Sequence, residues 1–421
     1  MNYLHSPRIL IFCLPMNSSN MNIITFGCRL NACESDLIKD FALELGIIDF
    51  ILINTCAVTA EAERKLLQTI RKLYNEDPNV KIILTGCASE LNPTRYIKMN
   101  GVVGIISNKT KLSRSEYLKY ASSKSISDIP DPKKVRGFLQ IQNGCDQKCT
   151  YCVVRLTRGS NISFPEDEIV AQAQSLLKKG YKEIVLTGVN ISSYGHDMNP
   201  KRNLAFIVRH LLKNVPSLTR LRLSSLDPAD IDNDLMEVIK SEERLLPHIH
   251  ESIQSGDNII LKRMMRRHNR EQLIEINEKI LSLRPDVVFG ADIIVGFPTE
   301  TDEMFLNTQK LLTEAKLSLL HIFQFSPRPR TPASLMPPIE KKVLQNRAKE
   351  LKKFAHEILF KKLSEQVGKN VIVLAEDHVN AKTNSFLRVK SLEKLETGRE
   401  YLFYCESVDK NAIIGRPVEK K

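Results

Sequence analysis

The sequence predicts an α/β protein in three parts: an N-terminal parallel sheet, a central partial (β/α)6 barrel and a small C-terminal β-barrel. The first two parts are predicted because β-rich runs alternate with helical patterns in two successive stretches of the chain. The third is predicted because the residues from 366 onward read as short strands separated by turns. At 421 residues the chain is also too long for one ordinary core.

The first part, residues 21–108, repeats a strand–helix unit in which each strand pattern ends in a cysteine. The strand patterns are MNIITFGC (21–28), FILINTC (50–56) and KIILTGC (81–87). Strand–helix–strand at this spacing predicts a parallel sheet with right-handed crossovers. Because ligands bind beyond the carboxyl ends of such strands, we expect Cys28, Cys56 and Cys87 to lie together and share a metal site. Buried structural thiols are the alternative interpretation.

The rest of the chain divides at a polar, serine-rich stretch, 109–136, which we interpret as a linker. The central part, 137–340, alternates six strand patterns with helices, and this alternation is typical of a partial (β/α) barrel. The strand candidates are 138–145, 182–188, 220–227, 246–254, 287–298 and 320–327. An amphipathic helix at 341–365 then leads to the last part, 366–421, with its short strands.

Composition limits the class of protein. A net charge of +12 favours a polyanionic partner such as nucleic acid, although a lysine-rich composition would explain it equally well. No stretch approaches the roughly 20 apolar residues that span a bilayer, so we expect no membrane partner. Nine cysteines without a convincing secretory signal favour metal or catalytic roles in a reducing cytoplasm. Residues 1–20, with Cys13, are expected to be a dispensable leader or to follow an upstream start codon.

The stretch NGCDQKCTYC (143–152) places Cys145, Cys149 and Cys152 at the end of the first barrel strand. A structural zinc site uses four protein ligands, and a disulfide would leave one thiol over. Three thiolates on a [4Fe–4S] cluster leave one iron open. S-adenosylmethionine fits that iron, because its amino and carboxylate groups can chelate it and its reduction releases a 5′-deoxyadenosyl radical. The spacing therefore predicts a radical-generating iron–sulfur enzyme.

From Met21 to the C-terminus the sequence resembles the radical-SAM methylthiotransferases. The motifs that carry the resemblance are GCRLNACESD (27–36), NTCAVTAEAERK (54–65), TGCASE (85–90), GCDQKCTYCVV (144–154), LTGVNISSYG (186–195), RLSSLDPADID (222–232), ESIQSGDNIILKRMMRRH (251–268) and ADIIVGFPTE (291–300). It is most similar to the branch that acts on N6-threonylcarbamoyladenosine in tRNA, beside the anticodon. The resemblance implies a methylthiotransferase domain, a radical-SAM barrel and a TRAM-like RNA-binding barrel.

The resemblance also implies roles for both sets of cysteines. Those of the barrel loop would hold the cluster that cleaves S-adenosylmethionine, and the strand-end cysteines would hold a second [4Fe–4S] cluster that carries the inserted sulfur. One S-adenosylmethionine would methylate that sulfur, and another would yield the radical that activates C2 of the adenine. The expected partners are tRNA and a flavodoxin- or ferredoxin-like one-electron donor, and the chain is taken as a monomer by default.

Further residues are candidates for contacts with S-adenosylmethionine because they flank the cluster or end barrel strands. They are Tyr151, Gly188, Val189, Asn190, Ser225, Gln254 and Gly296. By resemblance Tyr151 would flank the adenine, while the residues after the second strand would hold the amino group and Gln254 would reach the ribose. Shielding of the cluster, turn formation, capping or barrel core would explain these residues as well.

Several other polar residues have two readings each. His248 and His250 are interpreted as core histidines rather than ligands. Arg158 could pair with the S-adenosylmethionine carboxylate or with RNA. The cations that follow the fourth barrel strand could form a solvated helix face or bind tRNA phosphate. They are Lys262, Arg263, Arg266, Arg267 and Arg270.

Two alternative functions stay open at this point. The same chemistry could act on isopentenyladenosine in tRNA or on an aspartate of a ribosomal protein. A protein of another class, a non-catalytic iron–sulfur RNA-binding protein, would carry clusters without turnover. Sets of three cysteines argue against it, because a purely structural cluster ordinarily has four protein ligands.

Overall fold

A computed structural model describes residues 22–45, 50–120 and 135–420. The chain divides into two compact units. Of the described residues, unit 1 contains 22–45, 50–120, 143–161 and 326–335. Unit 2 contains 135–142, 162–325 and 336–420. The three-cysteine loop therefore belongs to the N-terminal unit. The prediction of a leader at residues 1–20 lies outside the described ranges.

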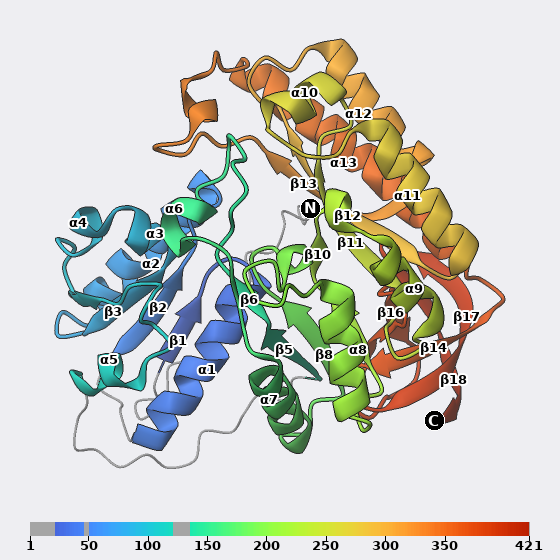
Figure 1. The fold of residues 1–421 in the computed structure, drawn as a ribbon, viewed down its shortest axis with the longest axis horizontal. Helices are drawn as coiled ribbons and strands as arrows, with labels where there is room; N and C mark the ends of the chain where they lie inside the picture. The colour runs from blue at the N-terminus through green and yellow to red at the C-terminus, as the bar shows by residue number, and fades with distance from the viewer. Residues whose placement is uncertain (1–21, 46–49, 121–134, 421) are drawn as a thin grey trace. The chain divides into compact units, whose positions relative to one another are not determined.

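Unit 1 is built on a four-stranded parallel sheet in the order β1-β2-β3-β4 (Figure 1). Its strands are β1 Asn22–Thr25, β2 Ile51–Thr55, β3 Ile82–Gly86 and β4 Val102–Ile105. Its helices are α1 Arg29–Leu45, α2 Ala60–Glu76, α3 Cys87–Leu91, α4 Pro93–Tyr96, α5 Arg114–Leu118 and α6 Val154–Arg158. Apolar residues pack on both faces of the sheet in two separate clusters. The sequence pattern missed β4, because it is only four residues long and Gly104 interrupts its apolar run.

The stretch expected to be a linker is partly folded. Within its described residues, α5 packs in unit 1 and the side chain of Lys111 is fully buried. The expectation of a solvated connector is therefore wrong for this segment. The sequence gives no local signal that a lysine is buried, because a buried ammonium group requires a buried counter-charge to offset its desolvation.

Unit 2 contains two parallel sheets, in the orders β5-β8-β9 and β10-β11-β12-β13. The third of the six predicted strands is broken at Ser224 into β9 and β10, where one sheet ends and the other begins. The strands are β5 Arg136–Gln140, β8 Glu183–Thr187, β9 Leu221–Leu223, β10 Ser225–Leu226, β11 His248–Gln254, β12 Val288–Val295 and β13 Leu317–Gln324. The main helices are α7 Glu166–Lys178, α8 Leu204–Asn214, α9 Asn233–Ser241, α11 Arg270–Leu283 and α12 Asp302–Glu314. This alternation confirms the predicted partial (β/α)6 barrel.

Shorter elements connect these strands and helices. They are β6 Gln142–Asn143, β7 Ile162–Ser163, η1 Ile191–Ser193, η2 Pro228–Asp230, α10 Asn258–Arg263 and η3 Pro332–Leu335. Several helices begin with polar caps, such as Asn269, which forms a capping box with Gln272 at the start of α11. No helix in the described ranges is long and apolar enough to cross a membrane.

Helix α13 (Lys341–Ser364) leads from the partial barrel into a closed five-stranded β-barrel at the C-terminus (Figure 1). Its strands are β14 Asn370–Ala375, β15 Asn380–Thr383, β16 Arg388–Ser391, β17 Glu400–Asp409 and β18 Ala412–Lys420. Closure follows the order β14-β15-β16-β18-β17 and leaves no unpaired edge. The predicted small β-barrel is thus confirmed.

The loop between β15 and β16 contacts the inner face of the parallel barrel. Phe386 stacks on His248 with ring centroids 4.9 Å apart, and the guanidinium of Arg222 lies 4.6 Å from its ring centroid. Arg222 is fully buried and pairs with the equally buried Glu183, whose pKa is held well below its usual range because Arg222 and Arg136 outweigh the effect of burial. Because β11 begins at His248, these contacts lie at the amino-terminal end of the barrel.

Candidate iron–sulfur and radical site

The cysteine loop after β5 presents its three thiols from a tightly hydrogen-bonded turn. The N–H of Cys145 donates to the carbonyl of Gly159 at 3.0 Å, and that of Cys152 donates to Cys149 at 3.2 Å. The N–H groups of Gln147 and Val154 point at the sulfurs of Cys145 and Cys152, each at 3.4 Å. Hydrogen bonds of this kind stabilise thiolate ligands of iron–sulfur clusters. The loop is therefore suited to a cluster held by three thiolates.

The other three predicted ligands meet at one edge of the unit 1 sheet. Cys28 and Cys56 follow β1 and β2, and Cys87 is the first residue of α3, directly after β3. Because these strands are adjacent and parallel, their carboxyl ends lie side by side. A side chain at Gly27 would lie 2.9 Å from the sulfur of Cys56, so the chain segments before Cys28 and at Cys56 are in close contact.

The chemistry of these thiols fits iron–sulfur clusters. The described cysteines form no disulfide. Burial, together with neighbouring Cys28 and Cys87, raises the pKa of the Cys56 thiol to about 12, so without a metal this thiol stays protonated at neutral pH. Burial likewise raises the pKa of Cys152 to about 12, and its neighbours include Cys149, Cys145 and Cys87. Such groups become ligands when metal charge stabilises the thiolate.

Two cysteines lie apart from these roles. Cys33 is buried within α1, five residues after Cys28, and Cys405 is buried within the C-terminal barrel. Burial raises the pKa of the Cys405 thiol to about 11. Cys33 is therefore part of the helix, and Cys405 is a buried thiol of the C-terminal barrel.

Arg158 lies between the two sets of cysteines in unit 1, and it does not face solvent. Its guanidinium donates to both carboxylate oxygens of Glu34, at 2.7 and 2.9 Å, and to the side-chain oxygen of Asn31 at 2.6 Å. The side chain is only 2% exposed. A contact with RNA is therefore excluded for this residue by burial, and Glu34 takes the place of the expected carboxylate ligand.

The loop after β8, predicted to hold the amino group of S-adenosylmethionine, is anchored by a residue that the sequence did not reveal. The side-chain oxygen of Gln142 accepts from the N–H of Val189 at 3.0 Å and from that of Asn190 at 2.9 Å. Gly188 packs closely against the same glutamine. Two backbone donors of the loop are thus already used, and Gln142 positions it. No local sequence signal marks a residue that acts on a segment more than 40 positions away.

The remaining candidates lie at strand ends, as expected. Ser225 begins β10, Gln254 ends β11 with a left-handed backbone (φ 74°), and Tyr151 is half-buried in the cysteine loop. The N–H of Gly296, just after β12, donates to Glu300 at 2.7 Å, and Glu300 pairs with Arg347 of α13 at 3.0 Å. Their contacts with S-adenosylmethionine stay predictions.

The cations that follow β11 are largely occupied within the protein. Arg266 and Arg267 pair with Asp227, each at 3.1 Å. Arg270 pairs with Glu314 and donates to the carbonyl of Asn307, while Arg263 donates to Thr299 at 2.7 Å. Arg266 and Arg267 thus neutralise the buried Asp227, while Lys262 is exposed, and phosphate binding by this segment stays a prediction.

Comparison with known proteins identifies the family of this chain. Residues 139–312 match the Radical SAM superfamily, and residues 20–107 match the Uncharacterized protein family UPF0004. The chain is 44% identical to the threonylcarbamoyladenosine tRNA methylthiotransferase MtaB of Rickettsia prowazekii, over 93% of this chain and 96% of the relative. It belongs to the radical SAM tRNA methylthiotransferases.

Other relatives agree with this assignment. The chain is 32% identical to the tRNA-2-methylthio-N(6)-dimethylallyladenosine synthase of Bacillus pumilus, over 86% of this chain and 77% of the relative. The radical S-adenosylmethionine methyltransferase TsrM of Kitasatospora setae superposes with a TM-score of 0.53 at 13% identity, covering 72% of this chain and 67% of TsrM, and shares the fold alone.

Family membership confirms several predictions. The methylthiotransferase is an enzyme, its cofactors are S-adenosylmethionine and [4Fe–4S] clusters, and tRNA is its substrate. The reading as a non-catalytic RNA-binding protein is thereby set aside.

Proposed function

We propose that this methylthiotransferase inserts a methylthio group at C2 of N6-threonylcarbamoyladenosine next to the tRNA anticodon. The observation that carries the proposal is the 44% identity to a threonylcarbamoyladenosine enzyme over nearly the full length of both chains. Relatives named for dimethylallyladenosine match at 32%. That nucleoside is the second candidate substrate.

The six cysteines would act as two sets. Cys145, Cys149 and Cys152 hold the cluster that binds S-adenosylmethionine, and the strand-end set of unit 1 holds the second cluster. When bound, these groups supply a 5′-deoxyadenosyl radical and the sulfur to be inserted. An aromatic C2–H bond has no acidic proton, so acid–base residues alone could not activate it.

The protein's own residues would position this chemistry. Backbone N–H groups stabilise the cysteine sulfurs, Gln142 holds the 188–190 loop, and the Glu300–Arg347 pair fixes the turn at Gly296. Domains at 21–108, 137–340 and 366–421 would supply sulfur transfer, radical generation and RNA binding. The enzyme would act in the cytoplasm with a flavodoxin- or ferredoxin-like electron donor.

The test is expression in a bacterium that lacks its own adenosine methylthiotransferases, followed by mass spectrometry of tRNA nucleosides. We expect 2-methylthio-N6-threonylcarbamoyladenosine. A methylthio-isopentenyladenosine product instead would replace the substrate and keep the chemistry, and neither product from soluble, iron-replete protein would refute the proposal.

Two cysteine variants test the division of labour. Cys149→Ala is expected to abolish 5′-deoxyadenosine formation from S-adenosylmethionine. Cys56→Ala is expected to keep that cleavage and to lose methylthiolation. Methylthiolation by Cys56→Ala would contradict the assignment of the second cluster.

A further inference from the structure

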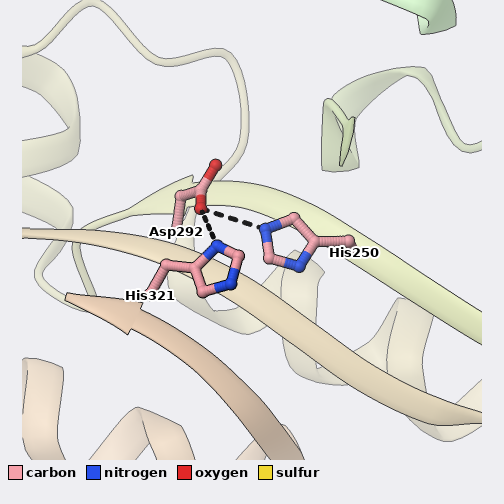
Figure 2. A group of neighbouring side chains, drawn as sticks. All are labelled: His250, Asp292 and His321. Carbon is pink, nitrogen blue, oxygen red and sulfur yellow. Dashed lines mark hydrogen bonds and ion pairs between the residues drawn. The ribbon is translucent and has the colours of Figure 1, made fainter. Parts of the chain in front are cut away.

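Two histidines and an aspartate, His250, Asp292 and His321, converge on the inner face of the unit 2 barrel; we call them the lumen triad. Figure 2 shows both imidazoles directed at the same carboxylate oxygen. Oδ1 of Asp292 lies 3.0 Å from Nε2 of His250 and 3.1 Å from Nδ1 of His321. The three residues come from neighbouring strands β11, β12 and β13, and Asp292 and His321 are cross-strand partners.

Strand alternation assigns the triad to the inside of the barrel. Ile249 and Ile253 of β11 and Ala291 and Ile293 of β12 belong to the core beneath the helices. Side chains at alternating positions point to the opposite face, which places His250 and Asp292 inside. Gly290 makes room for the imidazole, because a Cβ there would lie 2.6 Å from Nδ1 of His250.

The triad lies between the carboxyl-terminal ends of the barrel strands and the contact of His248 with the C-terminal barrel. His321 is three residues before the end of β13 at Gln324, and Asp292 is three before the end of β12 at Val295. At about 3.3 Å per residue this is roughly 10 Å inside the rim. Below, the imidazole of His248 stacks on Phe386 from the C-terminal barrel. A group that enters the barrel from the carboxyl-terminal ends of the strands therefore meets the triad before it reaches His248 and Phe386.

The exposure of the three side chains is graded. The side chain of His250 is 6% exposed, that of Asp292 is 24% exposed and that of His321 is 51% exposed. Burial alone would raise the pKa of Asp292, but His250 and His321 hold it well below its usual range, so the carboxylate is ionised. It accepts from Nδ1 of His321, and Nε2 of that ring is directed away from the carboxylate. Neutral Nε2 accepts from a hydroxyl or N–H, and protonated Nε2 donates to a carboxylate.

A buried amide on the inner face lacks a hydrogen-bond partner among the residues that the structure describes. Gln140 of β5 is 2% exposed, and neither its amide nitrogen nor its amide oxygen has a hydrogen-bond partner among the described residues. Its neighbours Leu139 and Ile141 belong to the core beneath the helices, so Gln140 faces the interior. Buried polar atoms are normally satisfied by protein, water or ligand. The amide of Gln140 therefore provides a hydrogen-bond donor and acceptor in the barrel interior that an apolar ligand could not use.

We propose that the lumen triad binds the polar N6 substituent of the target nucleoside, the threonylcarbamoyl group, through His321. This inference rests on the proposed function and deepens it. The substituent carries a ureido linkage, a hydroxyl and a carboxylate, each of which matches one state of Nε2. A dimethylallyl group carries none of these. A site built for hydrogen bonds rejects an analogue that lacks them, because its own polar groups are left unpaired.

The test uses three anticodon stem–loops that differ only at N6 of the target adenosine: threonylcarbamoyl, dimethylallyl and unsubstituted. Their Kd is measured on the cluster-loaded enzyme with S-adenosylmethionine by fluorescence anisotropy. We expect His321→Phe to weaken only the threonylcarbamoyl stem–loop, by about 10- to 100-fold. His321→Gln keeps an amide near the position of Nε2 and is expected to retain most of the affinity. His356→Phe, an exposed histidine on α13, is the matched control and should change nothing.

Several outcomes would overturn the proposal. His321→Phe could bind all three stem–loops as the wild type does, or weaken all of them equally, which would indicate a structural role. One equivalent of zinc or manganese in the wild type, lost in His321→Phe, would make the triad a metal site. Wild-type enzyme that fails to methylthiolate the threonylcarbamoyl stem–loop would instead refute the proposed function, and that failure appears before any variant is made.

Discussion

Glu34 of α1 is predicted to be the main electrostatic support of unit 1. Its side chain is fully buried, and its two oxygens bind the Lys111 ammonium at 2.5 Å and both terminal nitrogens of Arg158. Burial alone would raise its pKa, but Arg158 and Lys111 outweigh burial and hold it at about 2. Relative to an ordinary value of 4.5, this corresponds to about 3 kcal/mol of stability at neutral pH.

Glu34→Gln removes the negative charge and leaves two buried cations without it. Breaking a buried pair in this way costs about 3–5 kcal/mol, which agrees with the value worked from the pKa. Glu44→Gln is the control, because Glu44 lies on the same helix and pairs with Arg114 at 2.6 Å, but both side chains are more than half exposed. An exposed pair contributes less than about 1 kcal/mol.

The assay is anaerobic urea unfolding of both variants and the wild type, followed by circular dichroism. The folded-state pKa of Glu34 is lowered, so its contribution is present above pH 4.5 and disappears as the pH falls towards 2. The difference between wild type and Glu34→Gln should shrink over that range. Equal losses for Glu34→Gln and Glu44→Gln at neutral pH would refute the reasoning.

Three further predictions concern unit 2. Burial raises the pKa of Glu251 to about 8, so the protonated carboxyl contributes stability that is full below pH 4.5 and declines as the pH rises through 8. Glu251→Gln should therefore stabilise the protein by up to about 3 kcal/mol at pH 7. A loss of stability in urea unfolding would contradict this prediction. Gln142→Ala should raise the KM for S-adenosylmethionine about 10-fold in 5′-deoxyadenosine assays, because the N–H groups of Val189 and Asn190 lose their acceptor. Gln142→Glu should be less affected, and an unchanged KM in Gln142→Ala would count against the anchoring role. Phe386→Ala removes a stacked ring and its cation contacts, which should lower the free energy of unfolding by about 2–3 kcal/mol and speed hydrogen exchange in β15 and β16. Unchanged exchange would show that the loop does not hold the two barrels together.

The sequence by itself determined the α/β class, the partial barrel, the C-terminal β-barrel and the family. It did so because these depend on local signals: hydrophobic period, strand–helix alternation and the spacing of three cysteines within one loop. The grouping of Cys28, Cys56 and Cys87 was also predictable, since parallel topology brings consecutive strand ends to one edge. Their roles as cluster ligands stay predictions.

Only the tertiary structure decided which charged and polar residues pair. By sequence Arg158 is a candidate to pair with the S-adenosylmethionine carboxylate or with RNA, and Lys111 lies in the expected linker, yet both bind Glu34 in the interior of unit 1. Gln142 meets the 188–190 loop, and His250 meets Asp292 and His321, across more than 25 positions of sequence. A charge or hydrogen bond is satisfied by whichever group folding brings near, and sequence separation carries no record of that partner. Local pattern therefore fixed the elements, and long-range packing fixed the chemistry of their side chains.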